Sequence, residues 1–117
     1  MIITCAIIDD EPLAAGLLES YAKKTPYLSL AGTYSSAVEA MKHLRENPVQ
    51  LLFLDIQMPE LSGIEFAKIL PKETRIIFTT AFPQYAIEGF RVSALDYLLK
   101  PISYNDFLKA TDKALEW

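Results

Sequence analysis

Residues 51–66 read LLFLDIQMPELSGIEF and contain the features that decide the fold. The run 51–54 is apolar without alternating polar residues, which is typical of a strand that is buried on both faces. Asp55 follows this strand directly, and Gly63 breaks the loop ahead of a predicted helix over residues 64–70. The stretch therefore predicts a buried strand, an acidic side chain at its carboxyl end and a return helix.

The same alternation of strand and helix extends along the whole chain. Four further apolar runs have the length of a strand, at residues 2–8, 28–33, 75–80 and 95–99. Apolar positions with helical spacing lie between or after these runs: Leu13, Leu17, Leu18 and Tyr21; Val38, Met41 and Leu44; and Phe107, Thr111, Ala114 and Leu115. Five strand-helix units with short connections predict a three-layer α/β domain, because right-handed crossovers place helices on both faces of a parallel sheet.

Local signals mark where the helices begin and end. Pro12 suits the first turn of the first helix, Pro71 ends the third, and Pro83 opens the fourth. Serine and asparagine side chains can cap the others by accepting a hydrogen bond from the first backbone N–H groups. The candidate caps are Ser35 or Ser36 for the second helix and Ser103 or Asn105 for the last.

The length and composition bound the class of protein. A chain of 117 residues with 51% hydrophobic residues can form one packed core, and no repeat or Gly/Ser-rich linker divides it, so we expect one domain over residues 1–117. The net charge of -4 argues against a surface that binds nucleic acid by itself. A lone cysteine, Cys5, and the lack of a long apolar stretch predict a cytoplasmic protein that does not enter the membrane.

Acidic residues follow two of the predicted strands. Asp9 and Asp10 come directly after the first strand and Asp55 after the third. In a flavodoxin-like sheet those strands are neighbours, so the three carboxylates would converge at the carboxyl edge and repel one another unless a cation joined them. Oxygen ligands without a second His or Cys favour Mg²⁺ over Zn²⁺. The alternative is that Asp9 and Asp10 only cap the first helix.

A hydroxyl group and an ammonium group end the next two strands. Thr79 and Thr80 end the fourth strand, and Lys100 with Pro101 ends the fifth. Together with the carboxylates, these groups suit phosphoryl transfer to an aspartate, in which a metal and a lysine offset the phosphoryl charge. Taken alone, Lys100 also fits a solvated surface lysine.

Four segments resemble the signature segments of response-regulator receiver domains. They are IIDDEP (7–12), LLFLDIQMPELSGIEF (51–66), IIFTTAF (76–82) and ALDYLLKP (94–101). The resemblance implies a flavodoxin-like (βα)5 sandwich with a parallel five-stranded sheet of order 2-1-3-4-5. It also implies a signalling switch, rather than an enzyme, that accepts a phosphoryl group from a sensor histidine kinase.

The resemblance assigns roles to the acidic residues. It implies that Asp55 is the phosphoacceptor, that Asp10 and Asp55 bind Mg²⁺ directly, and that Asp9 binds it through water. The backbone carbonyl of Gln57 completes the protein ligands. The resemblance further implies that the rate of dephosphorylation depends on the side chains two positions after the phosphoacceptor and two after the switch hydroxyl, here Gln57 and Phe82. Because Phe82 cannot orient a water by hydrogen bonding, we expect slow to moderate self-dephosphorylation.

The remaining roles concern the switch itself. By the same resemblance Thr80 is the switch hydroxyl and Tyr97 the aromatic side chain that moves inward with it. Lys100 is the lysine of the site, and its peptide bond to Pro101 is expected to be cis. From the residues alone, Tyr97 would be a core aromatic.

Residues 81–103, AFPQYAIEGFRVSALDYLLKPIS, look like the LytTR-type regulators within this family. The receivers of such regulators precede a β-rich DNA-binding domain, so we expect this chain to be a receiver excised from a longer regulator that contacts DNA only through that absent C-terminal domain. A natural single-domain receiver is the alternative.

The resemblance also predicts partners. A sensor kinase should dock against the first helix, although we expect the apolar stripe of that helix to be used largely for the core. Phosphorylation should alter the face of the fourth helix, fifth strand and fifth helix and produce a homodimer. The residues that suggest this interface are Tyr85, Phe90, Arg91 and Asp96.

Three other classes of protein share part of the pattern. A haloacid-dehalogenase-type phosphatase has a second acid two positions after its aspartate, where this chain has Gln57. A nucleotide-binding module would show a GxGxxG run or a P-loop, and the sequence contains neither. A degenerate receiver that only binds proteins would lack some of the acidic, hydroxyl or lysine positions.

Overall fold

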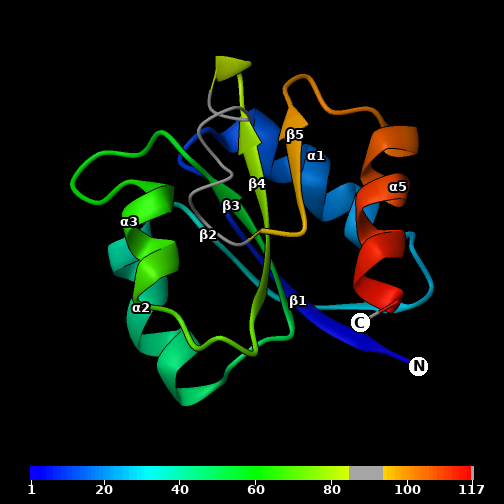
Figure 1. Cartoon of the computed structure of the whole chain (residues 1–117), viewed down its shortest axis with the longest axis horizontal. Helices are drawn as coiled ribbons and strands as arrows, with labels where there is room; N and C mark the ends of the chain where they lie inside the picture. Colours follow the sequence, from blue (N-terminus) through cyan, green and yellow to red (C-terminus); the bar gives the residue numbers. More distant parts are fainter. Residues whose placement is uncertain (85–93, 117) are drawn as a thin grey trace.

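The computed structural model describes residues 1–84 and 94–116 and shows a five-stranded parallel sheet with helices on both faces (Figure 1). The strand order is β2-β1-β3-β4-β5, so the predicted flavodoxin-like fold is confirmed. The elements are β1 (Ile3–Ile8), α1 (Pro12–Lys23), β2 (Leu28–Tyr34), α2 (Ala37–Glu46), β3 (Leu51–Asp55), α3 (Gly63–Lys68), β4 (Arg75–Thr80), β5 (Asp96–Leu99) and α5 (Tyr104–Leu115). The fourth helix expected after Pro83, with Tyr85, Phe90 and Arg91, lies outside the described residues.

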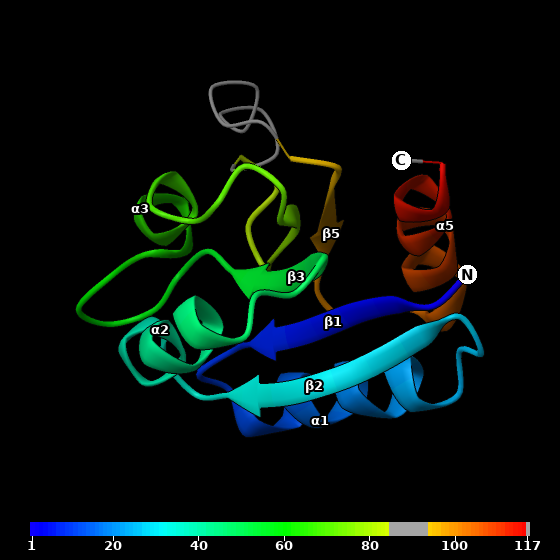
Figure 2. The ribbon, with the colours of Figure 1, turned by 90° about the horizontal axis from the view of Figure 1, so that it is seen from below.

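Alternation along the strands divides the core into two layers. Residues such as Ile7, Phe53 and Ile77 pack with α1 and α5, whereas Ile8, Leu54 and Phe78 pack with α2 and α3. Figure 1 shows these two pairs of helices on opposite sides of the sheet, and Figure 2 shows α1 lying along β1 and β2. Every residue of β3 is buried, which explains its unbroken apolar run.

Helix α1 buries only part of the apolar stripe that the sequence predicted. It packs on the sheet through Ala15, Leu18 and Ala22, which are three and four positions apart and therefore share one face. Leu13 and Leu17 lie beside that face, with 88% and 38% of their surfaces exposed. The expectation that the stripe is used largely for the core is wrong for these two leucines, because small alanines fill the contact instead.

Helix α2 shows the same substitution of alanine for larger residues. Ala37, Ala40 and Leu44 are buried, whereas Val38, which we expected on the apolar face, is exposed. A helix that lies close to a sheet favours small side chains at the contact, since larger ones would overpack it. Hydrophobic spacing correctly predicted this helix and the burial of Leu44, and Met41 packs against the core, but the prediction is wrong for Val38.

Serine side chains determine where three helices begin. Ser36, and not Ser35, caps α2 by accepting a hydrogen bond from Glu39 N at 3.0 Å, and Ser103, and not Asn105, caps α5. Ser62 forms a capping box with Glu65, so α3 begins at Gly63, one residue earlier than predicted. None of the helices within residues 1–84 and 94–116 has both the length and the hydropathy that a bilayer crossing needs.

Candidate functional site

Carboxylates from β1 and β3 meet at the carboxyl edge of the sheet. These two strands pair directly, so Asp9, one residue beyond β1, lies beside Asp55 at the end of β3. Suitable oxygen atoms of Asp9, Asp10 and Asp55 all lie within 4.8 Å of one another. Asp9 and Asp55 are buried and Asp10 is exposed, so the cluster forms a partly open acidic site.

Lys100 brings a positive charge into this acidic cluster. Its Nζ lies 3.0 Å from Asp9 Oδ2, 3.6 Å from Asp55 Oδ1 and 3.9 Å from Glu11 Oε1. The ammonium is mostly buried, and the peptide bond from Lys100 to Pro101 is cis. The solvated-surface interpretation of Lys100 is therefore wrong. Lys100 follows the last residue of β5, and its side chain extends along the carboxyl edge of the sheet to Asp9 and Asp55.

The electrostatics show that the site holds too much negative charge for one lysine. Burial raises the pKa of Asp55 to about 7, with the charges of Asp9 and Asp10 adding to the effect and Lys100 opposing it. Burial alone would lower the pKa of Lys100, but Asp9, Asp55 and Glu11 together raise it above its ordinary value. The ammonium thus stays charged, whereas the Asp55 carboxylate is disfavoured as an anion.

Helix capping accounts for only part of the acidic cluster. Asp9 Oδ1 accepts a hydrogen bond from Glu11 N at 2.9 Å, and Glu11, at the N-cap of α1, makes no side-chain capping bond. Asp9 Oδ2 is buried with no donor aligned on it among the described residues, although Lys100 Nζ lies nearby. The capping alternative explains one oxygen of Asp9 and leaves the convergence of the other carboxylates unexplained.

The donor set fits a hard divalent cation. Oxygen atoms of three carboxylates lie within 4.8 Å of one another, and one of the buried oxygens lacks an aligned donor among the described residues. All of these donors are oxygen atoms, which Mg²⁺ prefers. Gln57 lies two residues beyond the end of β3, and its side chain is exposed. Its backbone carbonyl is therefore the group of this residue that the resemblance assigns to the metal.

The two threonines at the end of β4 differ in their surroundings. Thr80 is buried, and its Oγ1 accepts a hydrogen bond from Phe82 N at 3.1 Å. Thr79 is fully buried, and its hydroxyl has no partner among residues 1–84 and 94–116. The ring of Tyr97 stacks on Phe78 with centroids 5.2 Å apart, and its buried hydroxyl also lacks a partner within the described chain.

Sequence reasoning missed the role of Gly63. Gly63 N donates to Ile56 O at 2.9 Å, and a Cβ atom added at Gly63 would lie 2.2 Å from the backbone oxygen of Asp55. Only glycine allows α3 to begin this close to the strand end that carries Asp55. A glycine eight residues after the acid and at the start of a helix was the available signal, but spacing alone does not reveal a close backbone approach.

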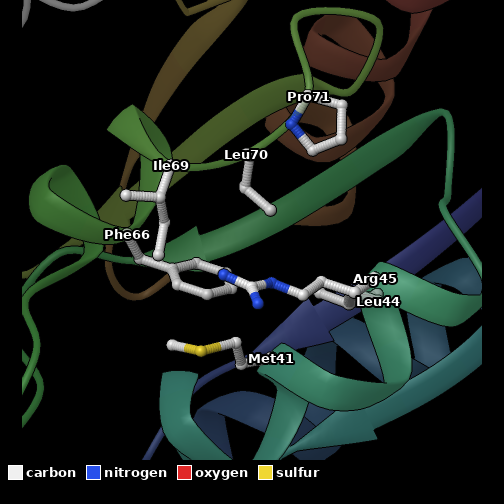
Figure 3. A pocket seen from close by; sticks show the side chains of 7 residues that line it. All are labelled: Met41, Leu44, Arg45, Phe66, Ile69, Leu70 and Pro71. Atoms are coloured by element: carbon white, nitrogen blue, oxygen red, sulfur yellow. The ribbon is translucent and has the colours of Figure 1, made fainter.

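A hollow lies between α2 and α3 (Figure 3). Helices that return between parallel strands run opposite to them, so the C-terminal halves of α2 and α3 lie toward the amino edge of the sheet. The hollow is apolar apart from Arg45. Its lining residues are Met41, Leu44, Arg45, Phe66, Ile69, Leu70 and Pro71.

Comparison with known proteins identifies the family. Residues 5–112 match the response regulator receiver domain, and the chain therefore belongs to that family. It is a receiver domain of a two-component response regulator, which is a phosphorylation-dependent signalling switch rather than a classical enzyme. The family predicted from the four sequence segments is confirmed.

Two relatives illustrate the similarity in sequence. The chain is 42% identical over 102 residues to an uncharacterized response regulatory protein of Shewanella oneidensis, covering 86% of this chain and 43% of the relative. It is 44% identical over 102 residues to the transcriptional regulatory protein BtsR of Escherichia coli K12, with the same coverage of 86% and 43%. The chain thus spans less than half the length of these relatives.

Solved structures show the same fold. The response regulatory domain of MrkE from Klebsiella pneumoniae superimposes with a TM-score of 0.87 at 28% identity, covering 97% of this chain and 96% of that one. The receiver domain of a putative response regulator NarL from Mycobacterium tuberculosis also gives a TM-score of 0.87, at 20% identity, covering 99% of this chain and 98% of that one.

Proposed function

We propose that Asp55 accepts a phosphoryl group in the presence of Mg²⁺, and that a sensor histidine kinase is the donor. The single observation that carries the proposal is a buried carboxylate whose pKa is raised to about 7, 3.6 Å from a charged lysine and beside two further carboxylates. A buried nucleophile with a cation on one side and metal ligands on the other is what phosphoryl transfer requires.

The chain's own residues perform the transfer. An Asp55 carboxylate oxygen attacks the phosphorus of the phosphohistidine, a P–O bond forms as the P–N bond breaks, and the imidazole leaves with the electron pair. Lys100 donates hydrogen bonds to the phosphoryl oxygens and offsets their charge. When held by Asp9, Asp10, Asp55 and the carbonyl of Gln57, Mg²⁺ supplies the further positive charge that the crowded carboxylates and the phosphoryl group need.

Thr80 and Tyr97 would convert this modification into a change of shape. In the structure the Thr80 oxygen accepts a hydrogen bond from Phe82 N, and its own O–H would donate to a phosphoryl oxygen on Asp55. Tyr97, already packed on Phe78, would then fill the space that Thr80 leaves. The shift favours one of two conformations because the phosphoryl group adds charge and acceptor oxygens at a single place.

The exposed leucines of α1 support a docking surface for the kinase. Leu13 and Leu17 lie one turn apart, and α1 begins three residues after Asp9, so these apolar side chains flank the acidic site. An apolar contact beside the phosphoacceptor would hold the donor histidine within reach of Asp55.

The phosphorylated receiver must pass its signal on to an output. We infer a LytTR-type DNA-binding domain C-terminal to this receiver in a cytoplasmic regulator, supported by the similarity to the transcriptional regulatory protein BtsR and by the greater length of the relatives. Phosphorylation would promote a homodimer through β5, α5 and the segment between β4 and β5. Of the residues predicted for that interface, Asp96 is described, and it pairs with Lys113 at 3.0 Å.

Intact-mass spectrometry with acetyl phosphate tests the proposal. Wild-type protein should gain one phosphoryl group with Mg²⁺ and none with excess EDTA, and Asp55→Ala should gain none in either condition. Glu65→Gln, which alters an acid of the α3 capping box outside the cluster, is the matched control and should be modified like the wild type. An adduct that persists in Asp55→Ala would exclude Asp55 as the acceptor.

A further inference from the structure

The two consecutive threonines of β4 lie on opposite faces of the sheet. Ile77 belongs to the core layer of α1 and α5, and Phe78 belongs to the layer of α2 and α3. Side chains alternate along a strand, so Thr79 lies on the face of Ile77 and Thr80 on the face of Phe78. The residue of β4 that is in register with Asp55 is Thr79.

Lys100 must pass over the end of β4 to reach the acidic cluster. The sheet order places β4 between β5, which precedes Lys100, and β3, which carries Asp55. Leu98 pairs with Thr79 across β4 and β5 and belongs to the same core layer as Ile77. Lys100, two residues after Leu98, starts on that face, and its Nζ ends 3.6 Å from Asp55 Oδ1.

The buried hydroxyl of Thr79 makes no hydrogen bond within the described residues that would explain why the position is polar. The residue is 0% exposed, and its Oγ1 lacks a hydrogen-bond partner among the described residues. A buried hydroxyl without a partner destabilises a fold, and valine would fill the same volume without that cost. Thr79 therefore supplies a polar group where packing alone favours an apolar one, at a position that adjoins both Asp55 and the path of Lys100.

We propose that Thr79 is a positioning residue for phosphoryl transfer, whose hydroxyl oxygen accepts a hydrogen bond from the Lys100 ammonium as it turns toward the phosphoryl group. The inference rests on the proposed function of Asp55. An ammonium has three N–H donors, and in the structure Lys100 Nζ lies 3.0 Å from Asp9 Oδ2, 3.6 Å from Asp55 Oδ1 and 3.9 Å from Glu11 Oε1. When Lys100 turns toward the phosphoryl oxygens, the hydroxyl of Thr79, in register with Asp55, then accepts a remaining N–H of the ammonium.

Thr79→Val and Thr79→Ser test this role with the purified receiver, acetyl phosphate and Mg²⁺. Thr79→Val should melt at the same temperature as the wild type or higher, yet its rate of phosphorylation at saturating donor should fall about tenfold, the loss expected for one hydrogen bond to a charged group. Thr79→Ser retains the hydroxyl and should keep most of the wild-type rate. Thr74→Val is the matched control, because Thr74 is a buried threonine whose hydroxyl donates to Val49 O at 2.9 Å at the other edge of the sheet. It should lose stability and keep the wild-type rate.

A double-mutant cycle connects the effect to Lys100. In a Lys100→Met background, Thr79→Val should change neither the rate nor the affinity for Mg²⁺ with beryllofluoride, a phosphoryl analogue, because the donor of the hydrogen bond is gone. Equal rates for Thr79→Val and wild type, equal losses in the valine and serine variants, or an undiminished effect in the Lys100→Met background would each overturn the inference. If the wild type itself takes up no phosphoryl group, the proposed function fails and the inference fails with it. In each of the other outcomes the wild type is phosphorylated, so the two kinds of failure can be told apart.

Discussion

Removing the charge of Asp55 should stabilise the metal-free receiver. The Asp55 carboxyl is 4% exposed and shares its site with Asp9 and Asp10, so its ionised form is disfavoured even with Lys100 nearby. Asp55→Asn keeps the shape and the hydrogen-bonding atoms of the side chain while it removes the negative charge. The variant should therefore unfold at a higher temperature than the wild type wherever Asp55 would otherwise ionise.

The raised pKa sets the size of this effect. A rise from 3.8 to about 7 is about three pKa units, which corresponds to at most about 4 kcal/mol at about 1.4 kcal/mol per unit. Relaxation of the site and entry of water reduce such penalties, so we expect about 2 kcal/mol at pH 8. For a domain of this length that difference raises Tm by about 8 °C.

The size of the effect should depend on pH in a defined window. Below about pH 4, Asp55 is protonated in both the folded and the unfolded chain, and the two proteins should be similarly stable. Between about pH 4 and 7 the unfolded chain ionises while native Asp55 holds its proton, so the wild type loses stability relative to Asp55→Asn as pH rises. Above pH 7 the difference should stay constant.

Thermal unfolding with EDTA at pH 4.5, 6 and 8 measures this difference, and Mg²⁺ provides the control. Mg²⁺ should stabilise the wild type, since it binds the folded state, and should stabilise Asp55→Asn much less. A variant that is no more stable than the wild type at pH 8 would show that burial and the neighbouring carboxylates do not disfavour the charge of Asp55, and would refute the reasoning.

Three further predictions concern the surroundings of Asp55. Gly63→Ala should lower the free energy of unfolding by about 1–3 kcal/mol and slow phosphorylation, because the new Cβ would meet the backbone oxygen of Asp55. Chemical denaturation measures the first effect and the acetyl phosphate reaction the second, and an unchanged variant would contradict the close contact. Phospho-Asp55 should decay over minutes or longer because Phe82 cannot orient a water, and loss within seconds would contradict this. Leu13→Asp should slow transfer from the cognate kinase while the rate with acetyl phosphate is unchanged, whereas equal slowing with both donors would refute a docking role.

The sequence predicted the architecture well because each strand is encoded by a continuous apolar run of its own residues. The unbroken apolar run 51–54 indicated a strand buried on both faces, and the structure buries all of β3. The acids and the lysine lie at strand ends, and parallel strands bring their carboxyl ends to one edge, so the convergence of Asp9, Asp55 and Lys100 also follows from topology.

Features that depend on close approach between elements could not be predicted in the same way. Hydrophobic spacing assigned Leu13 and Val38 to the core, but α1 and α2 pack through alanines and leave both residues exposed. The contact between Gly63 and the backbone of Asp55 depends on three-dimensional distances that no spacing encodes. The unpaired hydroxyl of Thr79 became visible only when register and burial were known together.

The most direct test of the central claim is to locate the phosphoryl group. After reaction with acetyl phosphate and Mg²⁺, borohydride reduces an aspartyl phosphate to homoserine, and peptide mass spectrometry identifies the residue that was modified. The account predicts homoserine at position 55 alone, and none when Mg²⁺ is withheld. Homoserine at Asp9 or Asp10 instead, or no reduced residue in folded protein that contains Mg²⁺, would contradict it.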